Sequence, residues 1–145
     1  MKTYSKFNAE ASEHDMYQYV VSLGIVNIPR LVTYDTERKI MTTELIESLN
    51  VADMYTDDPT MVPDYIWQLI VLTIVTLRSN GIIYPDITGY NFIYHDEKLW
   101  IIDFEHAVCE ESPAASYRMN QHADFIDEFC NWTPGMSKKW NPYFK

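Results

Sequence analysis

The stretch 84–105 contains three oxygen-bearing side chains whose types and spacing suit phosphoryl transfer. Asp86 lies in a predicted loop, Asn91 follows five residues later, and Asp103 comes directly after a predicted hairpin. Phosphoryl transfer needs a carboxylate that orients the attacking hydroxyl, and it needs oxygen ligands for the Mg²⁺ that neutralises the phosphates. Asp86 is a candidate for the first task, and Asn91 and Asp103 are candidates for the second.

Each of these residues also has a purely structural alternative. Asp and Asn side chains often bond to their own backbone in turns, so Asp86 and Asn91 could simply close a loop. Asp103 could cap the end of a strand. An acid that directly follows the apolar run 99–102 is costly, however, unless it meets a partner or a metal. The three residues taken together therefore favour a functional site over three separate caps.

Hydrophobic periodicity and turn residues predict the elements that must position this site. Apolar residues cover nearly every side of the pattern over 64–80, which predicts a helix buried on most sides. Aromatic residues after position 139 predict a tail that packs on the body of the domain. Along the chain, we expect a helix from residue 8 or 9 to just before Gly24, a hairpin of 31–35 and 39–46, a helical turn at 50–55, a helix at 64–80, a hairpin of 91–94 and 98–102, and a helix at about 120–132.

The composition is that of one soluble globular domain. The 145 residues are 47% hydrophobic, which is enough to bury a core. A formal net charge of −10 argues against nucleic-acid backbones and anionic membranes as partners. The two cysteines form no disulfide framework, and no apolar stretch is long enough to span a bilayer. We therefore expect a cytoplasmic protein, or one in the host cytoplasm if the chain is viral.

The motifs Asp-Ile-Thr-Gly-Tyr-Asn at 86–91 and Asp-Phe-Glu at 103–105 resemble those of the protein-kinase-like superfamily. The first is similar to the motif of small atypical kinases of the RIO type and of the tRNA-modification-associated type. The second, with Glu105 in place of glycine, is similar to aminoglycoside and choline phosphotransferases. The similarity covers roughly residues 2–130 and implies a truncated α+β kinase-like fold. A reduced N-lobe would occupy residues 1–49 and a minimal helical C-lobe residues 50–145.

The resemblance implies ATP and Mg²⁺ as cofactors and gives each motif residue a role. Asp86 would orient the attacking hydroxyl, Asn91 would hold a metal ion, and Asp103 would chelate Mg²⁺ on the phosphates. Thr43 would be the gatekeeper residue, and the segment from Glu44 to Ile46 would be the hinge whose backbone meets adenine.

A phosphate-binding lysine is also expected, paired with a glutamate from the middle of the first helix. Glu13 lies in that helix and is the candidate glutamate, although a solvated helix position is its structural alternative. Lys2 is the candidate lysine and Lys6 a weaker one.

The glycine-rich loop that covers the phosphates in kinases is missing. The four glycines are at positions 24, 81, 89 and 135, with none before the first helix. Two functions follow. The first is ATP·Mg-dependent phosphoryl transfer to a hydroxyl on a protein or small molecule, and we favour it slightly. The second is a pseudokinase that binds a protein partner without turnover; such a partner could supply the missing cover. A third reading is a structural domain with a coincidental motif.

Overall fold

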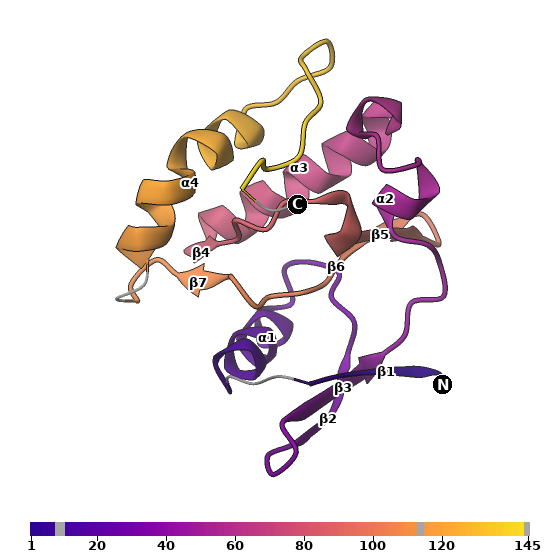
Figure 1. Ribbon diagram of the computed structural model, residues 1–145, viewed down its shortest axis with the longest axis vertical. Helices are drawn as coiled ribbons and strands as arrows, with labels where there is room; N and C mark the ends of the chain where they lie inside the picture. The colour runs from indigo at the N-terminus through magenta and orange to yellow at the C-terminus, as the bar shows by residue number, and fades with distance from the viewer. Residues whose placement is uncertain (8–10, 113–114, 144–145) are drawn as a thin grey trace.

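The computed structural model describes residues 1–7, 11–112 and 115–143 (Figure 1). A small sheet and one helix form one part of the molecule, and the remaining helices and two-stranded sheets form the other. The mixed α and β architecture agrees with the expected fold class. Within the described ranges, every helix is too short or too polar to cross a lipid bilayer.

The first part is built on an antiparallel sheet that has three strands among the described residues. These are β1 (Thr3–Phe7), β2 (Leu31–Asp35) and β3 (Ile40–Glu44), in the order β1-β3-β2. The hairpin of β2 and β3 was predicted, but β1 was not. Because β1 is a largely exposed edge strand, it lacks the alternation of apolar and polar residues that identifies a half-buried strand.

Helix α1 (Ala11–Leu23) connects the sheet to the rest of the molecule. Glu13, Tyr17 and Val20 lie at helical spacing and are all buried. The Tyr17 hydroxyl donates to the Pro29 carbonyl, and the Tyr17 ring meets the edge of Phe104 with centroids 5.9 Å apart. This helix therefore ties the segment that carries Asp103 to the sheet.

Asn27, in the connection after α1, forms a second tie between the two parts. Its side-chain amide donates to the Leu99 carbonyl at 3.2 Å, and its own carbonyl accepts from the Ile101 amide at 2.9 Å. The strand that ends before Asp103 is thereby fixed to the N-terminal part.

The second part contains helices packed around short two-stranded sheets. Asn50 caps its first helix, because the Asn50 side-chain oxygen accepts from the Asp53 amide at 2.8 Å. Strands β5 and β6 form the predicted second hairpin, whereas the two-residue strands β4 and β7 were not predicted. The elements are α2 (Val51–Met54), the 3-10 turns Pro59–Met61 and Gly89–Asn91, α3 (Asp64–Ser79), β4 (Ile82–Ile83), β5 (Phe92–His95), β6 (Lys98–Ile101), β7 (Val108–Cys109) and α4 (Ala115–Cys130).

The prediction that the central helix α3 is buried on most sides is confirmed except for one exposed strip, formed by Asp64, Tyr65, Gln68, Leu72 and Ser79. One broad face is in the core, formed by Ile66, Trp67, Ile70, Ile74 and Leu77. On the other face Leu72 is 60% exposed. An apolar residue is common on protein surfaces, so hydrophobicity alone could not show which face is covered.

Helix α4 and the C-terminal tail complete the core. The helix begins at Ala115, earlier than the predicted start near residue 120, and buries Phe125, Ile126 and Phe129. The tail packs on the body as predicted, since the Trp140 ring lies 4.8 Å from the Trp67 ring between centroids.

Candidate functional site

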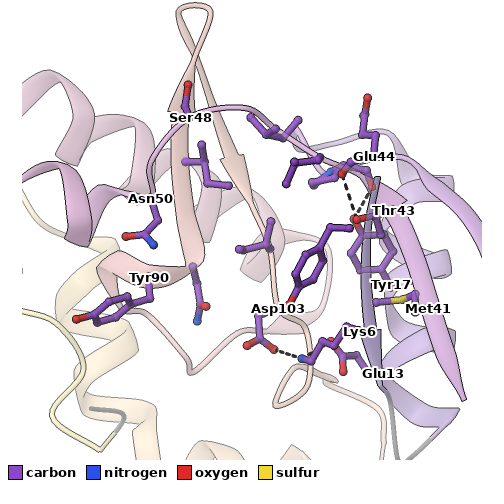
Figure 2. A pocket seen from close by; sticks show the side chains of 17 residues that line it. Lys6, Glu13, Tyr17, Met41, Thr43, Glu44, Ser48, Asn50, Tyr90 and Asp103 are labelled. Atoms are coloured by element: carbon purple, nitrogen blue, oxygen red, sulfur yellow. Dashed lines mark hydrogen bonds and ion pairs between the residues drawn. The ribbon is translucent and has the colours of Figure 1, made fainter. Parts of the chain in front are cut away.

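A cavity of about 380 Å³ lies between the sheet and the second part of the molecule (Figure 2). Its volume is in the range of small-molecule sites. Lys6, Glu13 and Asp103 lie at its charged end, and the other end is lined by apolar side chains together with Thr43 and Glu44. The lining residues come from β1, α1, β3, the connection between β3 and α2, and the segments around Asn91 and Asp103.

Lys6 is at the centre of the charged end. Its Nζ lies 3.1 Å from Glu13 Oε1 and 3.2 Å from Asp103 Oδ1, and it lies 3.8 Å from Glu105 Oε2. Figure 2 shows Lys6 between Glu13 and Asp103. One ammonium group thus joins β1, α1 and the segment after β6.

The surroundings of this ion pair determine its protonation. Burial alone would lower the pKa of Lys6, but the carboxylates of Asp103 and Glu13 more than offset it and raise the pKa above its usual value. Burial raises the pKa of Glu13, which is only 4% exposed, and the charge of Lys6 opposes that shift. Glu13 is therefore a buried ion-pair partner, and the alternative of a solvated helix residue is excluded.

The expected pairing of Lys2 with Glu13 was wrong. Lys2 lies 2.7 Å from Glu47 on the surface, where the two side chains are 73% and 55% exposed. Lys2 and Lys6 point to the same side of the chain, but four residues of an extended strand separate them by about 13 Å. Because β1 ends at Phe7 and α1 begins at Ala11, only a lysine at the end of β1 can reach Glu13.

Asp103 is held in an unusual backbone conformation. Its φ of 61° lies in the left-handed region, which aspartate and asparagine tolerate better than most residues. Its Oδ1 also accepts from the Glu105 amide at 3.3 Å. Such conformations persist where the surrounding structure imposes them, and they cluster at functional sites.

The loop with Asp86 and Asn91 lies beside Asp103. Asn91 is buried and lines the cavity, and its side-chain amide donates to the Asp86 carbonyl at 2.9 Å. Asp86 is beside Asn91, outside the cavity lining. Burial raises the pKa of Asp86, and the nearby charge of Asp103 raises it further, while Asn91 and His106 oppose the shift. The structure therefore brings the three motif residues into one region.

Thr43, Glu44 and Ile46 line the other end of the cavity. Thr43 is buried, and its hydroxyl donates to the Glu44 carbonyl at 3.1 Å. The Glu44 side chain accepts from the Arg30 amide at 2.9 Å, so it has a structural task. Their contacts with adenine stay predictions.

Several other lining residues were not predicted as part of a site. Tyr17 and Met41 were expected only as parts of a helix and a strand, and Tyr90 and Ile93 had no role. The sequence offers little signal for such residues, because an apolar side chain beside a ligand has the same pattern as one in the core.

Oxygen ligands at the charged end suit a metal ion that is shared with phosphates. Among the residues that the structure describes, no group of three or more His, Cys, Asp or Glu side chains could hold a metal ion alone. Asp103 and Asn91 supply a carboxylate and an amide oxygen to the same cavity. Mg²⁺ typically binds to one or two protein ligands together with substrate phosphates, so the residues fit this ion.

Three features meet at a cavity between the two parts: a lysine–glutamate pair, a loop with Asp and Asn, and an Asp after a hairpin. Together they define a protein-kinase-like domain. The chain matches the family model of the RIO domain over residues 2–136, and it belongs to this family. That match selects the RIO type among the branches that the motifs left open. No curated protein sequence matches the chain.

Solved structures confirm the truncated kinase-like fold. The chain is similar to the crystal structure of the Rio2 kinase from Chaetomium thermophilum in an ADP/Mg²⁺-phosphoaspartate complex, with a TM-score of 0.58 and 16% identity. The similarity covers 90% of this chain but 42% of the Rio2 chain. The chain thus spans less than half the length of that kinase, and at this identity the likeness supports the fold alone.

Proposed function

We propose that this RIO domain binds ATP with Mg²⁺ and transfers the γ-phosphoryl group to a hydroxyl on a protein or small molecule. The observation that carries the proposal is Lys6, which contacts both Glu13 and Asp103 at the charged end of the cavity. A lysine fixed in this way can meet phosphate oxygens while the apolar end receives the base.

The remaining residues have distinct tasks in the proposed reaction. The hydroxyl oxygen attacks the γ-phosphorus, the bond from that phosphorus to the β–γ bridging oxygen breaks, and ADP leaves. Asp86 orients the hydroxyl and accepts its proton, a task that its raised pKa suits. Mg²⁺ bound by Asp103 and Asn91 would neutralise charge on the phosphates.

Nucleotide binding without turnover is the second candidate. In the described part of the chain the sheet has three strands and β1 is at its edge, so no strand lies beyond β1 to cover the phosphates. Loss of one phosphate contact in the transition state costs about 3 kcal/mol, or two orders of magnitude in rate. A partner chain that restores this cover would bind next to β1.

An aspartate is an alternative phosphate acceptor. The complex of the Rio2 kinase contains a phosphoaspartate beside ADP and Mg²⁺. A phosphorylated carboxylate is an acyl phosphate, which hydroxylamine cleaves, whereas phosphate esters of hydroxyl groups survive. Treating any phosphorylated protein with hydroxylamine therefore distinguishes the two acceptors.

Thermal melting with ATP, with Mg²⁺ and with both tests the binding step. We expect stabilisation that needs both ligands and is lost in Asp103→Asn, a variant that tolerates the left-handed backbone of Asp103. Lys2→Met is the matched control and should respond as the unaltered protein does. No stabilisation at millimolar ATP and Mg²⁺ would contradict the proposal.

Phosphate transfer or ATP hydrolysis then separates the two candidates. Turnover that is lost in Asp86→Asn, while the stabilisation by ATP and Mg²⁺ remains, supports the enzyme. Stabilisation without turnover in the unaltered protein supports the binding module.

A further inference from the structure

The C-terminal segment 132–143, here named the strap, runs against the loop that contains Asp86. Trp140 packs on Trp67, and Lys138 forms an ion pair with Asp64 at 2.7 Å. The Trp132 indole donates to the Ser137 carbonyl at 3.2 Å. The first two contacts anchor the strap to α3, and the third closes a turn within the strap. Its last residues lie beyond the part of the chain that matches the RIO domain model.

Asn141 is the strap residue that reaches the loop. It is 1% exposed, and its side-chain amide donates to the Pro85 carbonyl at 2.6 Å. Its backbone amide donates to the Ile87 carbonyl at 3.0 Å. Asn141 therefore holds the peptide groups on both sides of Asp86.

Asn91 completes this arrangement, since its side chain holds the carbonyl of Asp86 itself. Three consecutive carbonyl groups of the loop, at residues 85–87, thus each accept a hydrogen bond from an asparagine. One asparagine is in the motif, and the other is fifty residues further along the chain.

Gly89 allows the strap to come this close. A Cβ atom at Gly89 would lie 3.0 Å from the Trp140 ring and 3.0 Å from the Ala52 backbone nitrogen. Ala52 in α2 and Trp140 in the strap both lie close to Gly89, so the loop is packed between α2 and the strap.

We propose that Asn141 is a positioning residue that fixes the backbone of Asp86 for phosphoryl transfer. The proposal rests on the proposed function. Asn141 is outside the cavity lining, so it acts on the orientation of Asp86 and leaves the nucleotide contacts unchanged. A small displacement of a catalytic group can reduce turnover by about a hundredfold.

The alternative is that Asn141 only stabilises the folded chain. Asn131→Ala provides a matched control, because the Asn131 side chain also donates to a backbone carbonyl, that of Asp127, at 2.7 Å. That contact is exposed and lies at the end of α4, away from the loop. Each substitution removes an amide-to-carbonyl hydrogen bond, and only the bond of Asn141 lies beside Asp86. Asn141→Ala also removes the contact with His122 Nδ1 at 3.3 Å and the oxygen that accepts from the Tyr143 amide at 3.2 Å.

The first measurement is steady-state kinetics on the full chain. In Asn141→Ala we expect kcat to fall by about ten- to a hundredfold while KM for ATP stays within about twofold, and Asn131→Ala should change neither. Equal kcat in the two variants would overturn the proposal, and so would a matched loss of ATP affinity and turnover.

Hydrogen exchange in the absence of nucleotide gives a readout that does not need activity. The amides of Ile87 and Thr88 bond within the loop, to the carbonyls of Pro85 and Asp86, and should exchange about tenfold faster in Asn141→Ala only. If the unaltered protein shows no turnover, the proposed function fails, and unchanged exchange would separately overturn the role of the strap. If Asn141→Ala does not fold, Asn141→Ser, whose side-chain hydroxyl can still donate a hydrogen bond, should show the same pattern more weakly. Uniform acceleration at all amides in Asn141→Ser would refute a local role.

Discussion

Replacing Lys6 with methionine should destabilise the domain by about 2–3 kcal/mol at neutral pH. Methionine keeps most of the apolar stem but removes the charge, so Glu13 remains 4% exposed without its cation and Asp103 loses the same partner. Removing one member of a buried ion pair costs about 3–5 kcal/mol. The Lys6 side chain is 27% exposed, so water replaces part of the interaction and the value lies below that range.

Lys2→Met is the matched control for this substitution. The pair of Lys2 and Glu47 is shorter, at 2.7 Å against 3.1 Å for Lys6 and Glu13. Both of its side chains are more than half exposed, so its loss should cost only about 0–1 kcal/mol. If the reasoning is correct, burial and not distance sets the larger cost.

The pH dependence of the cost identifies its source. The folded-state pKa of Glu13 is already raised, and without Lys6 nothing on that side opposes the effect of burial. A raised folded-state pKa gives stability that is present at low pH and is lost as the pH rises through that value. The cost of Lys6→Met should therefore be smaller at about pH 5 than at about pH 8, and Glu13→Gln in the same chain should recover part of it.

Urea unfolding, followed by tryptophan fluorescence, measures each variant and closes a double-mutant cycle. We expect a coupling energy between Lys6 and Glu13 of about 1–3 kcal/mol. A cost that is the same at both pH values and additive in the double variant would refute the assignment of a buried ion pair.

Three further predictions concern the loop and the core. Gly89→Ala should lower the free energy of unfolding by about 1–3 kcal/mol in urea melts, because the new methyl group would crowd Trp140 and the backbone of α2. Ile74→Ala should cost about 2–5 kcal/mol, whereas Leu72→Ala, at a 60% exposed position, should cost less than about 1 kcal/mol. If Asp86 must be ionised to act, kcat should rise with pH through its folded-state pKa, which lies above the ordinary aspartate value of 3.8; a flat acidic profile would contradict its role as base.

Local patterns were sufficient for most of the helices and hairpins. The hairpin of β2 and β3 and the helix α3 have strong periodicity and clear turn residues, and their bounds agree with the prediction within a few residues. Strand β1 was missed because pairing with β3, and not its own residues, makes it a strand. The exposure of Leu72 was missed for a similar reason, since the sequence does not say which neighbours cover a helix.

The candidate site was predictable where short motifs hold it together and not where distant elements meet. The step from Asp86 to Asn91 is local, and Asp103 follows directly from a hairpin, so their proximity follows from spacing. The choice of Lys6 over Lys2 depends on how β1 runs past α1. Asn141 left no sequence signal, because its contacts with the loop are with backbone carbonyls that every residue offers.

The contacts between the two parts of the molecule determine where the cavity could open. The chain crosses from the sheet to the second part between β3 and α2. Asn27 adds bonds to Leu99 and Ile101, and Tyr17 adds a ring contact with Phe104. In Figure 2 the contact of Lys6 with Asp103 lies at the end of the cavity away from Glu44 in β3 and from Ser48 in the connection that follows β3. Any opening of the cavity at that end would therefore have to break the ion pair of Lys6 with Asp103, which joins the sheet to the segment after β6.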